Sequence, residues 1–149
     1  MAVAALAAGL GLFGLFSVLW SGGLIVQFVV PDNYRGIFRL TIDQGATEAG
    51  RDRNGVWVYR IPESGALSVK RRFPFSEWHR VTAVFASGEL LAVAAGPPAV
   101  PYSDEVRLHS AGSTTRPEGR ETMDFFVGTD VQMVAATKAV DPPLGGVRR

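Results

Sequence analysis

The first charged side chain of this protein is Asp32, so the whole stretch from Ala2 to Val30 carries no charge. A helix from Ala2 to Trp20 would rise about 28 Å, close to the thickness of the hydrocarbon core of a bilayer. Apolar residues occupy every face of that helix, which distinguishes it from an amphipathic surface helix. The sequence therefore predicts a transmembrane anchor or signal segment over residues 1–23. An anchor would meet membrane lipid through residues 2–20.

Two other interpretations of this stretch remain open. Ser21 and Gly23 are small residues at positions −3 and −1 relative to a cleavage site before Leu24, as in a cleaved signal peptide. A buried helix of a soluble protein would normally show a polar stripe, which is missing here. The positive-inside rule, applied to Arg35 and Arg39, favours a cytoplasmic location for the rest of the chain, although long domains often override that rule.

Composition divides the 149 residues into a leader, one domain at 24–140 and a Pro- and Gly-containing tail at 141–149 that is predicted to be disordered. The 15 Lys and Arg and the 14 Asp and Glu residues all come after the leader, as expected for an ordinary folded domain. The absence of cysteine excludes disulfides, a lipidated cysteine and thiolate metal sites. A net charge of +1 gives no field that would attract nucleic acid.

Short segments that alternate apolar and polar residues, separated by turn residues, predict an all-β domain. The polar segment Ala111–Glu121 is predicted as a loop, and Val131–Val140 as a last strand or a helix, with a slight preference for the helix. The expected architecture is an antiparallel sandwich or small barrel preceded by one N-terminal transmembrane or signal helix. The strands are expected at Leu24–Val30, Ile37–Asp43, Val56–Ile61, Leu67–Val69, His79–Phe85, Leu90–Ala94, Glu105–His109 (an edge strand) and Met123–Val127.

Three motifs occur in a fixed order. They are Val30-Pro31-Asp32-Asn33-Tyr34-Arg35-Gly36, Tyr59-Arg60-Ile61-Pro62-Glu63-Ser64-Gly65-Ala66-Leu67 and Phe125-Phe126-Val127-Gly128-Thr129. On these motifs the chain resembles a family of uncharacterised bacterial domains found behind signal peptides or single membrane spans. The resemblance implies an extracytoplasmic β domain and no activity, because none is assigned to the family. This chain departs from the Tyr-rich strand of that family, since it has Trp78-His79-Arg80-Val81-Thr82-Ala83-Val84-Phe85 there.

The candidate ligand surface consists of aromatic residues that could stack on a glycan or a peptide. Such residues more often form the core or cross-strand pairs, which is the alternative to a ligand surface. The departure from the family pattern puts any shared aromatic surface in doubt. The candidates are Tyr34, Trp57, Tyr59 and Trp78.

Other candidate sites have weaker support in the sequence. His79 and His109 lack metal-ligand spacing even with Asp104 and Glu105 included, so no metal and no cofactor are expected. Ser64 lies in a turn without a nucleophile elbow, which leaves catalysis unsupported. Basic residues at 70–72, Lys-Arg-Arg, could meet lipid head groups or an acidic partner, but a solvated strand end is the more common reason for such a run.

The sequence favours a single-pass, membrane-tethered, extracytoplasmic β domain with a structural or binding role and no evident catalysis. Its partner beyond lipid would be another envelope protein or a glycan, engaged through a strand edge or a loop surface. One alternative is a small hydrolase-type enzyme that uses Ser64 or a histidine. A second is an accessory subunit of a membrane assembly, packed through Gly9, Gly11 and Gly14 of the leader.

Overall fold

The computed structural model describes residues 23–47, 49–115 and 120–140. The predicted anchor or signal helix and the predicted tail fall outside the described residues. Within the described ranges, no helix has the length and apolar character needed to cross a bilayer.

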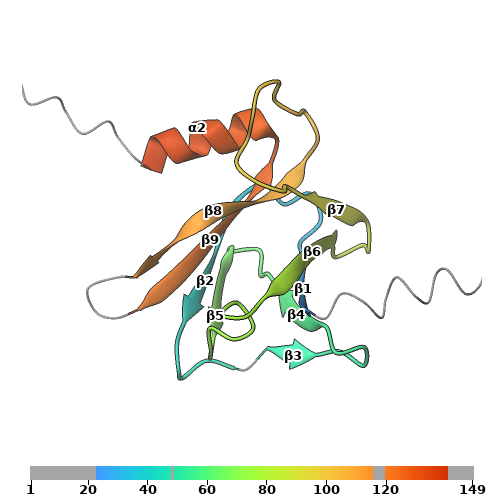
Figure 1. Ribbon diagram of the computed structural model, residues 1–149, viewed down its shortest axis with the longest axis vertical. Helices are drawn as coiled ribbons and strands as arrows, with labels where there is room; N and C mark the ends of the chain where they lie inside the picture. The colour runs from blue at the N-terminus through green and yellow to red at the C-terminus, as the bar shows by residue number, and fades with distance from the viewer. Residues whose placement is uncertain (1–22, 48, 116–119, 141–149) are drawn as a thin grey trace, which may run out of the picture.

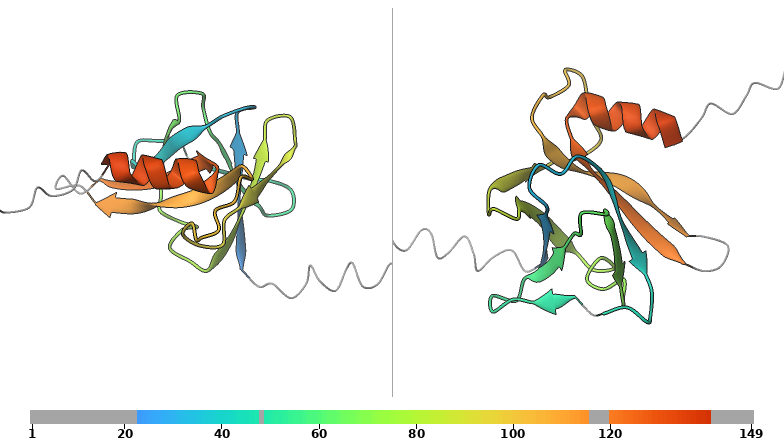
Figure 2. Two further views of the ribbon diagram at one scale, coloured as in Figure 1. Left: turned by 90° about the horizontal axis from the view of Figure 1, so that it is seen from above. Right: turned by 180° about the vertical axis from the view of Figure 1, so that it is seen from behind.

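The described residues form one curled sheet and one helix (Figure 1). The strands are arranged in the order β3-β4-β1-β6-β7-β8-β9-β2-β5 in that sheet. The all-β prediction is confirmed, and the sheet curls into half a barrel whose edge strands, β3 and β5, are not paired with each other (Figure 2). The elements are β1 (Leu24–Val30), β2 (Gly36–Ile42), β3 (Gly50–Arg51), β4 (Trp57–Arg60), β5 (Ala66–Val69), β6 (His79–Phe85), β7 (Leu90–Val93), β8 (Arg107–Thr115), β9 (Glu121–Gly128) and α2 (Asp130–Val140).

Strand pairing in the sheet is mixed, whereas the sequence predicted antiparallel pairing. β1 runs parallel to both of its neighbours, β4 and β6, and the pairs β2–β5 and β7–β8 are parallel as well. The predicted hairpin of β6 and β7 is antiparallel, as are β2–β9, β3–β4 and β8–β9. Alternation in a sequence shows which side chains face the core, but it is the same for both pairing directions, so it could not reveal the parallel pairs.

We call the end of the sheet at which β1, β4 and β6 begin the basal end, and the opposite end, which carries α2, the distal end (Figure 1). Register fixes this polarity, because Leu24 of β1 pairs with His79 at the start of β6. The chain enters the sheet at the basal end through Gly23. The next residue, Leu24, donates its N–H to the carbonyl of Trp78 at 3.2 Å. The first described residue therefore lies directly beside the loop that precedes β6.

The core lies on the inner face of the curl and is centred on Phe28 of β1. Alternate residues of β1 (Val26, Phe28 and Val30) are completely buried, as the period of two along a strand requires. The Phe28 ring contacts four other aromatic rings, contributed by β2, β4, β9 and the segment before β6. Their centroids lie 5.3 Å away for Phe38, 5.9 Å for Tyr59, 6.2 Å for Phe75 and 4.8 Å for Phe125.

Strand β8 differs most from the prediction. The expected edge strand Glu105–His109 is an interior strand that begins at Arg107 and continues to Thr115, so the predicted loop at Ala111–Glu121 is wrong over most of the described part. The distal half of β8 is buried, but its last residues are exposed and pair only with β9. Because those residues bury no side chains, they lack the apolar alternation by which strands are recognised.

Helix α2 confirms the helical alternative for the last segment. Thr129 and Gln132 form a capping box: the Gln132 N–H donates to Oγ1 of Thr129 at 3.3 Å, and the Thr129 N–H donates to Oε1 of Gln132 at 3.0 Å. Met133, which is 6% exposed, is the apolar side chain that the first turns of the helix bury against the outer face of the sheet. The helix is thus fixed mainly through its first turn.

Candidate functional site

The sheet has a gap between β6 and β8. β7 pairs with β6 only at Ala83 and Val84, and with β8 only at Arg107 and Leu108. As far as the described chain goes, residues 80–82 of β6 and 110–115 of β8 therefore have no strand partner on the sides that face β7. The edge of β6 and the start of the unpaired edge of β8, at Ser110, thus border one opening in the sheet.

A cleft of about 950 Å³ occupies this gap, which is within the size range of ligand pockets in proteins. Its floor is apolar and comes from the inner face of the sheet, where Leu108 and Phe125 belong to the core. The small exposed side chain of Ser110 leaves room above this floor. The remaining lining residues are Gly23, Ile25, Trp78, His79, Arg80, Val81, Val93, Ala94 and Ala95.

The basal rim of the cleft is aromatic. The Trp78 side chain is 77% exposed, which is unusual for so large an apolar group. His79 beside it donates from Nδ1 to the carbonyl of Glu77 at 2.7 Å and packs edge-on against Phe75 at 5.4 Å. His79 is held as part of the rim, so its ring does not reach across the cleft toward other polar groups.

The structure separates the four candidate aromatic residues. Tyr59 is 2% exposed and belongs to the core, where burial raises its pKa to about 12. Tyr34 lies at the distal end, where its hydroxyl donates to the carbonyl of Ile37 at 2.7 Å, and burial raises its pKa too. Trp57, the first residue of β4, and Trp78, just before β6, lie at the basal end beside the start of β1. A ligand surface therefore remains a prediction for these two tryptophans only.

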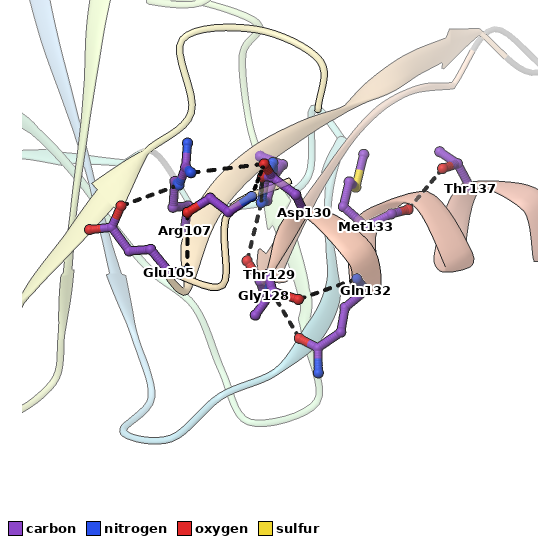
Figure 3. A network of polar contacts seen from close by, with 10 residues as sticks. Glu105, Arg107, Gly128, Thr129, Asp130, Gln132, Met133 and Thr137 are labelled. Carbon is purple, nitrogen blue, oxygen red and sulfur yellow. Dashed lines mark hydrogen bonds and ion pairs between the residues drawn. The ribbon is translucent and has the colours of Figure 1, made fainter. Parts of the chain in front are cut away.

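A polar network at the distal end surrounds Asp130, the first residue of α2 (Figure 3). Its Oδ2 accepts the backbone N–H of Ser103 at 2.9 Å and lies 3.8 Å from Nη2 of Arg107. Its Oδ1 lies 3.8 Å from Nε2 of His109, which donates to the carbonyl of Gly128 at 3.1 Å. Asp130 is only 4% exposed, so this network joins the helix to β8 and to the loop before β8.

The distal network does not resemble a hydrolase site. His109 is 1% exposed, so a substrate cannot reach its imidazole. Among the described residues, its Nδ1 has no hydrogen-bond partner, and no hydroxyl is placed to act as a nucleophile. Ser64 lies in the turn between β4 and β5, where its Oγ accepts the N–H of Ala66 at 3.4 Å. The described chain also contains no cluster of three or more metal-ligating side chains.

Comparisons with known proteins leave the family open. No family model and no curated protein matches the sequence. Among solved structures, a "Putative Lipoprotein" from Bacillus anthracis aligns with a TM-score of 0.40 at 13% identity, over 70% of this chain and 68% of that chain. A similarity this low carries no information about function, so the functional argument rests on the residues of this chain alone.

The sequence interpretation missed the cleft and the distal network. The cleft brings together β6, β8 and β9, whose residues Val81, Ser110 and Phe125 are far apart in the chain, and no local pattern links them. The helix start did have a local signal, because Thr129 and Gln132 have the Thr-x-x-Gln spacing of a capping box. That signal would have placed Asp130 in a first helical turn.

Proposed function

We propose that this protein is a membrane-tethered binding domain that accepts an extended peptide segment of another envelope protein in the cleft between β6 and β8. The observation that carries this proposal is the pair of strand edges, residues 80–82 of β6 and the start of the unpaired edge of β8 at Ser110, on either side of an apolar floor. An added strand would take its backbone hydrogen bonds from these edges. Its alternate side chains would enter the apolar cleft.

The cleft suits a peptide better than it suits catalysis. Leu108 and Phe125 form a floor that buries apolar side chains, and Ser110 adds one hydroxyl. The charged side chain at the cleft is Arg80, while His79 is already bonded to the chain itself. Affinity would come from main-chain hydrogen bonds and burial of apolar area, and no bond is made or broken.

The tether and the extracytoplasmic location are supported by the sequence. The apolar segment Ala2–Trp20 has the length of a membrane span, and it ends four positions before the first residue of β1. The resemblance carried by the three motifs implies a domain outside the cytoplasm. A single-pass anchor connected directly to a folded β domain fits both observations.

Photo-cross-linking tests the cleft in cells that express the full chain. A benzoyl-phenylalanine at Ser110 should give a discrete, protease-sensitive adduct, whereas the same probe at Ser87, an exposed turn residue at the distal end, should not. Val93→Glu places a charge in the cleft and should abolish the adduct. Leu90→Glu, in the same strand and 84% exposed, is the matched control and should preserve it. A protease-resistant adduct would instead identify a glycan, and equal adducts from both positions would refute a cleft-specific partner.

Membrane fractionation and proteolysis test the tether separately. The full chain should remain with membranes after a salt and carbonate wash, and protease added to spheroplasts should digest the domain. Release by the wash would contradict the anchor. Protection of the domain until the cells are lysed would place it in the cytoplasm.

A further inference from the structure

The basal end of the sheet collects aromatic and basic side chains from three separate parts of the chain. Trp57 begins β4, Phe73 comes after β5 and Trp78 precedes β6, yet all three lie at this end because β1, β4 and β6 begin together and β5 ends there. Phe73 packs edge-on against Trp57 with ring centroids 5.2 Å apart. The Phe73 side chain is 38% exposed and the Trp78 side chain 77%. Large aromatic side chains that are so exposed are characteristic of membrane interfaces.

Basic residues surround these rings. The guanidinium of Arg51 lies over the Trp57 ring, 5.2 Å from its centroid. Lys70 and Arg71 line the small hollow between Trp57 and Phe73. We call this set the basal collar, and its basic members, all exposed, are Arg51, Arg53, Lys70, Arg71, Arg72 and Arg80.

The acidic residues at this end only partly balance the collar. Asp52 is engaged in its own turn, where Oδ1 accepts the N–H groups of Asn54 and Val56 at 2.8 and 2.9 Å. Glu121 is paired with Arg72 at 3.3 Å. Among the described residues, the other carboxylates at the basal end belong to Asp43 and Glu77, so the balance of the described charges there is positive. The distal end instead carries the carboxylates of Asp32, Glu63, Glu89, Asp104, Glu105 and Asp130 against the basic side chains of Arg35, Arg60, Arg107 and Lys138, so its balance is negative.

The position of the collar relative to the chain entry indicates its partner. Three residues separate Trp20 from Leu24, and four residue steps of an extended chain span at most about 14 Å, at about 3.5 Å each. The basal end therefore lies within about 14 Å of the end of the predicted span Ala2–Trp20. If that stretch crosses a bilayer, as the proposed function requires, the basal end is the part of the domain nearest the head groups. An exposed positive and aromatic surface at that distance matches the chemistry of an anionic lipid surface.

We propose that the basal collar seats the domain on anionic lipid head groups, with Trp78 and Phe73 at the interface and the basic residues above the lipid phosphates. This proposal rests on the tether of the proposed function and adds the orientation of the domain on the membrane. In that orientation the basal rim of the cleft faces the lipid, and the acidic distal end points away. The contact between the basal collar and the lipid weakens at high ionic strength, because the basic residues of the collar are solvent-exposed.

Spin labels on the full chain test this orientation. The chain has no cysteine, so single Ser76→Cys and Ser87→Cys variants each give one labelling site, at the basal and the distal end respectively. Both residues are exposed. The labelled protein is reconstituted into nanodiscs of phosphatidylcholine alone, or with about one third phosphatidylglycerol. Collisions with a water-soluble nickel chelate and with lipid-soluble oxygen then report where each label lies.

In the anionic discs the label at position 76 should be several-fold less accessible to the nickel chelate than in the neutral discs. The label at position 87 should be equally accessible in both. Lys70→Gln combined with Arg80→Gln should lower the ratio of seated to unseated domain by roughly 25-fold, about fivefold for each basic residue removed. Arg60→Gln combined with Lys138→Gln removes the same charge from exposed residues away from the collar and should leave the ratio unchanged.

Equal accessibility of position 76 in both lipids would overturn the proposal and leave an acidic protein as the partner of the collar. Equal losses from the two double variants would also overturn it, because the effect would then depend on net charge alone. Failure of the tether gives a different result. If the labelled protein does not float with lipid vesicles at all, the proposed anchor fails. If the protein floats but the label at position 76 stays accessible to the nickel chelate, only the contact between the basal collar and the lipid is refuted.

Discussion

Replacement of Phe28 by alanine should be among the most damaging single changes to this domain. Phe28 is completely buried and touches four other aromatic rings, which belong to three other strands and to the segment before β6. Truncation of a buried phenylalanine costs about 3–5 kcal/mol, and each aromatic pair adds about 0.5–1.5 kcal/mol beyond buried area. Because the pairs share one ring and are not additive, we expect a loss of about 5 kcal/mol.

Urea unfolding of the full chain in mild detergent, monitored by circular dichroism, measures this loss. Phe73→Ala is the control, since Phe73 is 38% exposed and makes one ring contact, with Trp57; it should cost about 1 kcal/mol. Where Phe28→Ala leaves too little folded protein, Phe28→Leu should cost roughly 1–2 kcal/mol. A loss below about 2 kcal/mol for Phe28→Ala, or one no larger than that of Phe73→Ala, would refute the central place of this ring.

Three further predictions use the same unfolding assay. Arg39 binds both carboxylate oxygens of Asp124 at 2.6 Å, yet its side chain is 43% exposed, so a double-mutant cycle with Arg39→Gln and Asp124→Asn should give a coupling of only about 0.5–1 kcal/mol. A coupling energy of zero would show that the ion pair between Arg39 and Asp124 does not stabilise the domain. Burial raises the pKa of Tyr59 from 10.0 to about 12, so folding favours its neutral form; stability is complete below pH 10 and should fall by about 3 kcal/mol as pH rises through 12. Tyr59→Phe should remove this loss of stability at high pH. If the variant still lost the same stability, another group would be responsible for the loss. Thr129→Ala deletes the helix cap and should cost about 1 kcal/mol, which Thr129→Ser should largely restore.

The strands that bury side chains could be predicted from the sequence. β1 and β6 were located correctly, because Leu24–Val30 is a short run of strand-favouring residues and His79–Phe85 precedes a clear hairpin turn. The end of β8 could not be found in this way, because its exposed residues are held by backbone pairing with β9 and bury nothing. A strand that is held only by backbone hydrogen bonds shows no apolar/polar alternation in its sequence.

The candidate site was predictable only in part. Trp57 and Trp78 were selected as aromatic residues, but their common place at the basal end depends on the parallel pairing of β1 with both β4 and β6. Parallel neighbours are distant in sequence, so nothing local encodes them. The cleft has the same origin, since it exists because β7 is too short to pair with the whole of β6 and β8.

The central place of β1 also determines how the domain would respond to mechanical tension. A force applied through the entry at Gly23 pulls along the axis of β1, which is paired with β6 from Leu24 to Val30 and with β4 from Val26 to Val29. Both ladders are then loaded in shear, so their hydrogen bonds must break together, whereas a pull across the strands would break them one at a time. A domain held in this way would resist unfolding under a pull along β1 better than under a pull across it.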